Sequence, residues 1–590
     1  LIHGLLTGIR PFAYTGLIGT LPRGKVDLET LEETRKGVAG LAQKAGIDFE
    51  YQPSGYPHFP VRPEPSAADA PPSALQIIGW RALQFVQQVA TANVAELAPG
   101  ASVSAFLLDC RGTLIDRVLI QREERDEWGR DRYLLSPSPE RVTRVATWLR
   151  HWSDGYVLFD EEDILRKIEG PVIVEEVQDH MDDLCLPSES VELCATASQL
   201  LSDYPDLFDL TKPYFIGQSY LLSVASDAHA PSWHWEPQDM PLMRTPLFEA
   251  HRAMGATIVP FAGWEMPVWY SSVSDEHQAV RETAGLFDVA HMGVFEVEGP
   301  HAIAFLDTVC TNYVAWLEDG QSCYSYLLDP QGAVIDDVMV YRLQSECFLL
   351  VVNAANEVKD WDWLNAVNER RVLIDLDRPW VRVEAPAVLR NLKDPAEGER
   401  QKRDLALQGP ASLPTLQAMT DDLALREALA RIRRTDLVEC ELAGFPLVLA
   451  HTGYTGEKWG FEIFVHPDNA LALWRAILEA GAPFGVRPAG LGARDSTRTE
   501  AGLPLYGHEL AGHFAILPDE AGFSGYVKYH KPFFIGRQAL LAQEGQGRLV
   551  VRFRVDDRGV RVPHLGDPVA NRKGQFIGHV TSCSIDAEGQ

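Results

Sequence analysis

The run Gly492-Ala493-Arg494-Asp495-Ser496-Thr497-Arg498-Thr499-Glu500-Ala501-Gly502-Leu503 is the most informative stretch of this 590-residue chain. It places two arginines, Arg494 and Arg498, four residues apart between two glycines. Taken alone, an arginine followed by an aspartate is most often a surface ion pair of little energetic value. A guanidinium can instead bind a carboxylate, and other motifs of the chain favour that interpretation.

Two adjacent carboxylates, Asp336-Asp337, follow the turn Asp329-Pro330-Gln331-Gly332 and open a predicted strand. Successive strand residues face opposite sides of a sheet, so only one of the two can enter a given site. An ionised carboxylate can orient an attacking amine and stabilise the cation that develops on it. The alternative is a pair of solvated acids at the end of a turn.

Two further motifs are Phe287-Asp288-Val289-Ala290-His291-Met292 and Gly453-Tyr454-Thr455-Gly456-Glu457. Together the four motifs resemble the aminomethyltransferase (T-protein) family of the glycine cleavage system, from about Thr245 to the end of the chain. The implied fold is α+β: a multi-subdomain cloverleaf around a folate site with a C-terminal β-barrel. The chain stops soon after Ser582-Cys583-Ser584, so we expect that barrel to be truncated.

The resemblance implies an enzyme, a folate-dependent aminomethyltransferase. It would take an aminomethyl group from the lipoyl arm of a small carrier protein (H-protein-like), release ammonia and form methylenetetrahydrofolate. Tetrahydrofolate is the implied cofactor, and no metal is implied. The second hypothesis is a tetrahydrofolate-dependent demethylase of a small methylated donor. The third is a non-catalytic folate-binding regulatory protein.

The resemblance makes Asp337 the catalytic carboxylate, Glu462 the pterin anchor and Arg494 a cation of the folate site. A carboxylate such as that of Glu462 can accept two parallel hydrogen bonds from the N3–H and 2-amino edge of a pterin. The other implied cofactor-binding residues are Met292, Tyr324, Val351, Asn353, Tyr454, Tyr526 and Arg561.

Two rival residues stay open at this point. Lys458-Trp459 lengthens the turn before Gly460, which makes Glu457 a competitor for the role of Glu462. Arg498 competes in the same way with Arg494. His291 is interpreted as structural, because a lone histidine beside a methionine in a strand is more often structural than a base.

The chain also repeats itself. Thr91 to Val118 aligns without gaps to Thr311 to Val338, 220 residues further on. Lys212-Pro213-Tyr214-Phe215-Ile216-Gly217 similarly matches Lys531-Pro532-Phe533-Phe534-Ile535-Gly536. The spacing is far above that of solenoid repeats, so we expect a duplicated domain. The predicted strands of the repeat are 102–108, 114–120, 322–328 and 334–341; helices are predicted at 302–309 and 361–368, and Ser274 and Asp468 are predicted helix N-caps.

The upstream copy lacks the chemical groups of the downstream one. Arg117 stands at the position of Asp337, and Ser138 stands at the position of Asn353. We therefore expect a degenerate, non-catalytic domain. The predicted divisions are an N-terminal segment with a Pro-rich linker (1–73), the degenerate domain (74–240), the folate-binding domain (241–530) and a partial barrel (531–590).

Composition limits the partners and the compartment. A net charge of -30 repels nucleic acid and anionic membranes, so neither is an expected partner. No apolar run is long enough to span a bilayer. The eight cysteines are scattered with no CxxC pair, which is typical of reduced thiols in the cytoplasm. The start lacks the basic region of a signal peptide, which argues against one. It also lacks an initiator Met, so we expect a processed or truncated N-terminus.

Overall fold

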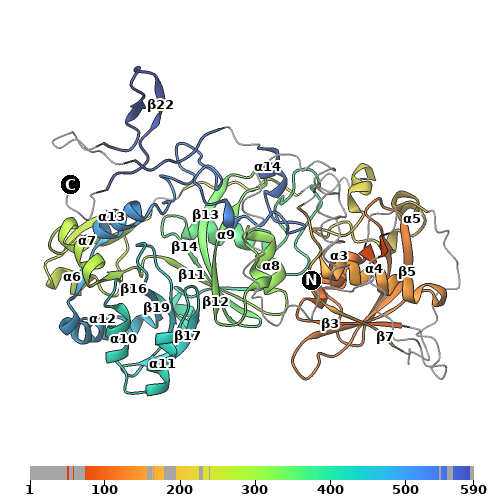
Figure 1. Cartoon of the computed structure of the whole chain (residues 1–590), viewed down its shortest axis with the longest axis horizontal. Helices are drawn as coiled ribbons and strands as arrows, with labels where there is room; N and C mark the ends of the chain where they lie inside the picture. The colour runs from red at the N-terminus through yellow and green to blue at the C-terminus, as the bar shows by residue number, and fades with distance from the viewer. Residues whose placement is uncertain are drawn as a thin grey trace.

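The computed structural model describes residues 50–51, 57–58, 74–155, 163, 165–177, 195–224, 230–237, 240–543, 547–553 and 563–584. Helices and strands are mixed throughout, so the predicted α+β class agrees with the structure. Three large sheets organise these residues. Figure 1 shows the upstream sheet (orange) at one end of the molecule and the two downstream sheets (green to blue) at the other.

The upstream sheet has five strands in the order β4-β5-β6-β3-β7. Its strands are β3 (Ala74–Gly79), β4 (Ser102–Leu108), β5 (Leu114–Arg122), β6 (Asp131–Ser136) and β7 (Ile173–Val177). Helices α3 (Ala82–Val89) and α4 (Val142–Asp154) cover one face of the sheet, and the core lies between these helices and the sheet. The shorter helices are η1 (Pro139–Arg141), α5 (Ala197–Asp203), η2 (Pro205–Leu207) and η3 (Gln218–Val224).

A second five-stranded sheet has the equivalent order, β12-β13-β14-β11-β15. Its strands are β11 (Gly293–Glu298), β12 (Gln321–Leu328), β13 (Val334–Gln344), β14 (Cys347–Val352) and β15 (Val388–Asn391). Helices α8 (Ala302–Val309) and α9 (Glu357–Asn368) cover one face, and η4 (Val314–Trp316) follows α8. Val338 and Val340 of β13 point into this core, so Asp337, Met339 and Tyr341 face the opposite side of the sheet.

The third sheet has six strands in the order β17-β18-β19-β16-β10-β20. Its strands are β10 (Ala284–Asp288), β16 (Arg403–Gln408), β17 (Leu437–Leu442), β18 (Phe445–Ala450), β19 (Gly460–Val465) and β20 (Val486–Ala489). Its helices are α7 (Val273–Glu282), α10 (Ser412–Ala418), α11 (Leu423–Arg431), α12 (Pro467–Gly481) and α13 (Leu491–Ala501), with η5 (Pro395–Arg400) and η6 (Ala482–Phe484). Val448 and Phe464 of this sheet pack against Tyr341 and Val351, so the second and third sheets meet on the Asp337 side of β13.

The remaining elements are short. They are the strand pairs β1 (Glu50–Tyr51) with β2 (Pro57–His58), β8 (Thr257–Phe261) with β9 (Trp264–Trp269), and β21 (Pro568–Ala570) with β22 (Phe576–His579), and helices α6 (Phe248–Ala253), η7 (Ser524–Tyr526) and α14 (Arg537–Ala542). The hairpin of β21 and β22 projects from the body in Figure 1. The predicted C-terminal barrel stays a prediction. Among the described residues, no helix has both the length and the apolar character needed to cross a bilayer.

The sequence repeat corresponds to repeated three-dimensional contacts. Lys212 Nζ donates to the carbonyl oxygen of Ala90 at 2.6 Å, and Lys531 Nζ donates to that of Cys310 at 2.7 Å. Both β4–β5 and β12–β13 contain a register shift next to the second leucine of their Leu-Leu-Asp motif. The two five-stranded sheets therefore share strand order, irregularities and buried contacts.

Two predicted helix caps were wrong. Ser272 caps α7, because its side chain accepts a hydrogen bond from Asp275 N at 3.1 Å, and Ser274 lies inside the helix. His466 caps α12, and Asp468 is in the first turn after Pro467. The predicted strand 102–108 and helix 302–309 have the observed bounds of β4 and α8.

Candidate functional site

Asp337 is buried on β13 and has two side-chain donors. Tyr324 Oη donates to Asp337 Oδ2 at 2.8 Å, and Asn353 Nδ2 donates to Asp337 Oδ1 at 2.8 Å. Tyr324 lies on the neighbouring strand β12, and Asn353 follows directly after β14. Three consecutive strands therefore fix the orientation of this carboxyl group.

Asp336 faces the other side of the sheet, toward the start of α9, as strand alternation predicts. Its carboxylate accepts from Asn353 N at 2.9 Å and from Asn356 Nδ2 at 2.6 Å. The buried carboxyl group of Asp360 lies on the same side, close enough for the two carboxyl groups to act on each other's pKa. Burial and the Asp336 charge raise the pKa of Asp360 well above its ordinary value, which favours its protonated form.

Burial raises the pKa of Asp337 to about 7, and the neighbouring charge of Asp336 adds to this effect. The hydrogen bonds from Tyr324 and Asn353 act in the opposite direction, because they stabilise the ionised form. A carboxyl group with this pKa changes its charge close to neutral pH. It can therefore hold a negative charge or take up a proton during a reaction at that pH.

Tyr454 and Arg494 lie together near Asp337. The guanidinium carbon of Arg494 is 6.0 Å from the centre of the Tyr454 ring. The Tyr454 hydroxyl is buried without a hydrogen-bond partner, and Asp337 and Arg494 both act electrostatically on it. Within the described part of the chain, no carboxylate lies within ion-pair distance of Arg494, so a pairing of Arg494 with Asp337 is not observed. A buried hydroxyl near the Asp337 carboxyl group thus lies beside a cation that pairs with no described carboxylate.

Glu462 lies on β19 at the junction of the second and third sheets. Thr452 Oγ1 donates to Glu462 Oε2 at 2.5 Å, and Tyr341 Oη donates to the same oxygen. Both bonds go to Oε2, and no described residue donates to Oε1. Tyr341 is four residues after Asp337 on the same face of β13, which separates the two positions by roughly 13 Å.

Apolar side chains occupy the face of β13 and β14 between these two carboxylates. Met292, Met339 and Val351 belong to one cluster, to which Tyr341 also contributes. Tyr526 lies at the Asp337 end, where its ring meets the Tyr324 ring edge-on with centroids 4.9 Å apart. The predicted residues Met292, Tyr324, Val351, Asn353, Tyr454, Tyr526, Glu462 and Arg494 thus all lie around the Asp337 face of β13 or along the junction of the two sheets. Arg561 lies outside the described residues.

The rival carboxylate Glu457 forms an ion pair with Arg281, with Nη1 and Oε1 2.6 Å apart. Its side chain is only 15% exposed, although residues of turns usually face solvent. Arg281 also contacts Glu500, so Glu457 belongs to a network that joins the turn to α7 and α13. The turn itself is tight: a Cβ atom on Gly453 or Gly460 would collide with the side chain of Gln408.

The rival arginine Arg498 is fully buried. Its guanidinium pairs with Glu509 at 2.6 Å and with Asp495 at 2.6 Å. His291 is also buried; burial, with the nearby charge of Arg494, lowers its pKa to about 3, so the imidazole is neutral at pH 7. The guanidinium of Arg498 is therefore occupied by structural ion pairs, whereas no carboxylate in the described part of the chain pairs with Arg494.

The upstream copy contains an altered version of this arrangement. Asp116, at the position of Asp336, accepts from Ser138 N at 2.9 Å, as Asp336 does from Asn353 N. Arg141, which stands where the downstream copy has Asn356, donates to Asp116 at 2.9 Å. The upstream carboxylate is thus balanced by a cation, and Arg117 occupies the position of Asp337.

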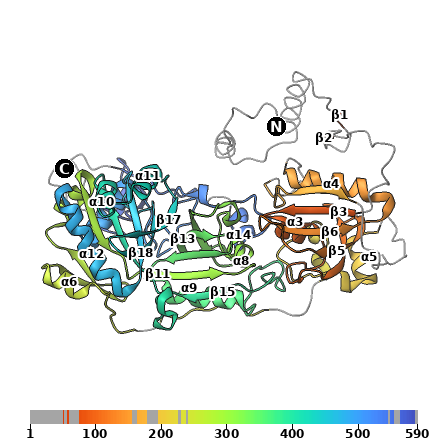
Figure 2. The same cartoon turned by 90° about the horizontal axis from the view of Figure 1, so that it is seen from below.

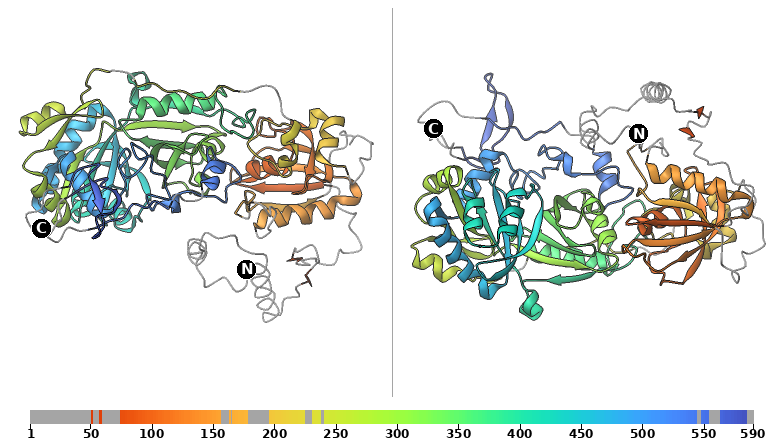
Figure 3. Two further views of the ribbon diagram at one scale, coloured as in Figure 1. Left: turned by 90° about the horizontal axis from the view of Figure 1, so that it is seen from above. Right: turned by 60° about the horizontal axis from the view of Figure 1, so that its bottom comes forward.

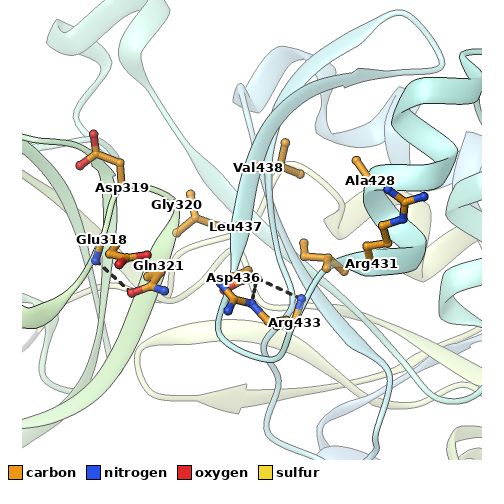
Figure 4. A pocket seen from close by; sticks show the side chains of 11 residues that line it. Glu318, Asp319, Gly320, Gln321, Ala428, Arg431, Arg433, Asp436, Leu437 and Val438 are labelled. Carbon is orange, nitrogen blue, oxygen red and sulfur yellow. Dashed lines mark hydrogen bonds and ion pairs between the residues drawn. The ribbon is translucent and has the colours of Figure 1, made fainter. Parts of the chain in front are cut away.

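A surface hollow of about 320 Å³ lies elsewhere, between α11, the start of β17 and the start of β12. Figure 4 shows its lining, in which Arg433 contacts Asp436 and Gln321 contacts Glu318. None of its lining residues belongs to the Asp337 site. In the described residues, no cluster of three or more His, Cys, Asp or Glu side chains has the arrangement of a metal site.

Sequence reasoning missed four side chains of the candidate site. Tyr341 and Met339 share the face of Asp337, and the two-residue period of a strand would have identified both. Thr452 directly precedes the quoted Gly453 motif, but its bond to Glu462 depends on the pairing of β18 with β19. Asp360 carries no local signal, because it reaches Asp336 from a helix 24 residues later in the chain.

Comparisons with known proteins agree with this geometry. Residues 247–531 match the family model described as the GCVT N-terminal domain. The aminomethyltransferase of Symbiobacterium thermophilum is 45% identical over 349 residues, which cover 58% of this chain and 86% of that protein. The aminomethyltransferase of Desulfitobacterium hafniense (strain Y51) is 43% identical over 346 residues, with coverages of 58% and 86%.

Among solved structures, the glycine cleavage system aminomethyltransferase T from Bartonella henselae is 31% identical and has a TM-score of 0.48. That match covers 59% of this chain and 87% of the other. The two curated relatives match over most of their own length, and the residues that match the family model include Asp337, Glu462 and Arg494. The chain belongs to the aminomethyltransferase (GCV_T) family.

Proposed function

We propose that this protein is a folate-dependent aminomethyltransferase, which transfers a one-carbon unit from an aminomethyl group on a lipoyl carrier protein to tetrahydrofolate and releases ammonia. The observation that carries the proposal is the buried Asp337, held by Tyr324 and Asn353 and facing the unpartnered hydroxyl of Tyr454. The names of the 40–45% identical relatives support the aminomethyl donor.

The residues present fit tetrahydrofolate. The free Oε1 of Glu462 and its fixed Oε2 suit the donor edge of a pterin, and Met292, Met339 and Val351 offer an apolar surface for a flat ring. The buried, unpartnered Tyr454 hydroxyl is a polar group that lacks a ligand atom. When bound, tetrahydrofolate would supply the amine that takes up the one-carbon unit.

The residues of the chain act by position and charge. Asp337 holds a negative charge at the end of the site opposite Glu462, where it can stabilise a nearby cation or accept a proton at Oδ1 or Oδ2. Tyr324 and Asn353 keep that carboxyl group in one orientation. Arg494 offers an unpaired cation for a carboxylate of the ligand. The raised pKa of Asp360 keeps a proton on the buried pair of Asp336 and Asp360 behind the site. Asp337 therefore has one ionised carboxyl neighbour and not two.

We further propose that residues 74–240 are a degenerate copy of part of the same fold, that 241–530 form the folate-binding domain, and that 1–73 and 531–590 are a linker segment and a partial barrel. The shared strand order of the two five-stranded sheets supports the duplication.

The six described cysteines without a disulfide partner support a reducing compartment, the cytoplasm.

The identity of the one-carbon donor distinguishes the proposed function from its alternative, a demethylase that uses a small methylated molecule. The test is one-carbon transfer to tetrahydrofolate by the full chain: methylenetetrahydrofolate formation with aminomethylated lipoyl carrier protein in one series, and methyltetrahydrofolate formation with methylated amines in the other. We expect turnover with the lipoyl carrier protein and none with the methylated amines. Turnover with the methylated amines alone would establish the demethylase, and folate binding without turnover on either donor would establish a regulatory protein.

The raised pKa of Asp337 predicts the pH dependence of turnover. The carboxyl group is protonated below about pH 7, so kcat/KM is expected to fall as the pH decreases through 7. Tyr324→Phe removes a bond that favours the ionised form, so it should move this acid limb to higher pH. The measurement is kcat/KM from pH 5.5 to 9 for both proteins. A limb near pH 4, or one that the variant does not move, would mean that another group titrates.

A further inference from the structure

The contact between the upstream and downstream copies is built from equivalent residues on both sides. The segment after the second helix of each copy meets the Lys-Pro-Tyr/Phe-Phe-Ile-Gly segment of the other copy. Lys167 N donates to His530 O at 2.9 Å, and Arg382 N donates to Thr211 O at 2.8 Å. Lys167 and Arg382 are 215 residues apart, and Thr211 and His530 are 319 residues apart, which are the spacings of the repeat in these segments.

Side-chain contacts repeat in the same way. Arg537 binds Asp163 with both terminal nitrogens, at 2.5 and 3.0 Å, and the equivalent pair is Gln218 with Arg378 at 2.5 Å. Glu169 accepts from the hydroxyl of Tyr313, while the carbonyl oxygen of Glu384 accepts from Asn93 Nδ2 at 3.4 Å. Each contact occurs twice, and the position that the upstream copy supplies in one is supplied by the downstream copy in the other. Interfaces with two-fold symmetry have this arrangement.

The arrangement of the layers agrees with a two-fold relation. Figure 2 shows α4 above the upstream sheet and α9 below the downstream sheet, and Figure 3 shows the same opposition from another side. Apolar packing also crosses the interface: Phe533 packs against the cores of both copies, and Leu210 packs against the downstream core. The upstream copy therefore lies where a second downstream domain would lie in a symmetric pair.

Only one half of this pair leads to the candidate site. We define the strap as residues 524–537, which run from Tyr526 at the site to Arg537 at the interface. Lys528 N donates to the carbonyl oxygen of Thr311, and the Thr311 hydroxyl donates to the carbonyl oxygen of Tyr526. The same hydroxyl accepts from Tyr326 N on β12. The ring of Tyr526 lies against Tyr324, which holds Asp337.

A second connection runs through the segment before η4. Tyr313, held by Glu169, stacks on Trp316 and on His530 of the strap. Its neighbour Asn312 donates to the carbonyl oxygen of Tyr324 at 2.7 Å. Upstream residues therefore contact both chain segments that support Tyr324 and Tyr526.

We propose that the degenerate upstream copy is a built-in partner that holds the strap and thereby positions Tyr526 and Tyr324 in the folate site of the downstream copy. This inference rests on the proposed function only for the identity of the ligand. The Asp163–Arg537 pair is the central contact, because Arg537 is 1% exposed and also bonds to the carbonyl oxygen of Tyr529 in the strap. Asp163 and Glu169 are positioning residues, since neither touches the site.

The two-fold interface provides its own matched control. Asp163→Asn weakens the contact that reaches the folate site, and Gln218→Ala weakens the equivalent contact between Gln218 of the upstream copy and Arg378 of the downstream copy. Both variants are made in the full chain, and two properties are measured: tetrahydrofolate affinity by calorimetry, and hydrogen exchange without folate. The informative amides are those of Lys528 and its equivalent Asp209, which bond to Thr311 O and Thr91 O, each at 2.9 Å.

Asp163→Asn is expected to speed exchange at Lys528 and to weaken tetrahydrofolate binding about three- to tenfold. Gln218→Ala is expected to speed exchange at Asp209 only and to leave affinity within about twofold of the unaltered chain. Tyr313→Phe, which loses the bond to Glu169 but keeps its ring stacking, should act in the same direction as Asp163→Asn. Its matched control is Asn93→Ala.

Equal effects of Asp163→Asn and Gln218→Ala on affinity would overturn the proposal, since the upstream copy would then act only as a scaffold. Unchanged exchange at Lys528 in both Asp163→Asn and Tyr313→Phe would also overturn it, because the strap would not depend on the interface. If the unaltered chain binds no tetrahydrofolate, the proposed function fails, while the exchange measurement still decides whether the upstream copy holds the strap.

Discussion

Asp337→Asn is expected to reduce folate-dependent turnover by about 10²- to 10⁴-fold, the usual range for loss of a positioned acid or base. The substitution removes the charge at nearly constant shape. The amide can still accept from Tyr324 or Asn353, so the fold and tetrahydrofolate affinity should change little. Steady-state kinetics with the lipoyl carrier donor, together with calorimetry for tetrahydrofolate, measures the two properties separately.

The upstream copy supplies the control for this variant. Arg117→Gln changes the equivalent strand position in the upstream copy, which has an arginine there in place of the carboxylate, and it should leave turnover unaltered. If Asp337→Asn retains full activity, the reactive carboxyl group is a different one, and Asp336 becomes the first candidate. Because Asp336 faces α9 and accepts a hydrogen bond from Asn356 there, that outcome would also contradict the orientation of the site described above.

Glu462→Gln is expected to weaken tetrahydrofolate binding by roughly tenfold or more, because a buried donor edge that loses a charged acceptor costs on the order of 1–3 kcal/mol or more. Thr452 and Tyr341 can still bond to the amide oxygen, so the local structure should persist. Tetrahydrofolate affinity by calorimetry measures the effect.

Glu457→Gln is the matched comparison. It breaks the pair with Arg281, so it should lower the thermal stability of the turn region and leave folate affinity nearly unchanged. If Glu457→Gln weakened tetrahydrofolate binding more than Glu462→Gln did, Glu457 would be the residue that binds the pterin. The longer turn at Lys458-Trp459 would then have shifted the register that the sequence motif implies.

Much of the local structure could be predicted from the sequence because it depends on short-range patterns. The strands around Asp336-Asp337 follow from apolar alternation between turn residues, and the same alternation separates the two carboxylates onto opposite faces of β13. The internal repeat predicts two units alike in fold, and the two sheets have the same strand order. The helix caps were missed by two residues, since neighbouring polar residues such as Ser272 and Ser274 offer equally good local signals.

The long-range contacts of the site could not be predicted in this way. Asp360 and Thr452 act through partners on other elements, and sequence spacing says nothing about such contacts. The burial of Glu457 was missed for the same reason, because its partner Arg281 is 176 residues away. The two-fold contact between the copies also appears only in three dimensions, where Asp163 meets Arg537.

The most direct test of the central claim is a single-turnover measurement of ammonia release. The full chain, in excess over aminomethylated lipoyl carrier protein, is mixed with or without tetrahydrofolate. We predict rapid release of one ammonia per carrier with tetrahydrofolate, formation of an equal amount of methylenetetrahydrofolate, and near loss of both in Asp337→Asn. Release at the same rate without tetrahydrofolate, or at the same rate in Asp337→Asn, would contradict the account.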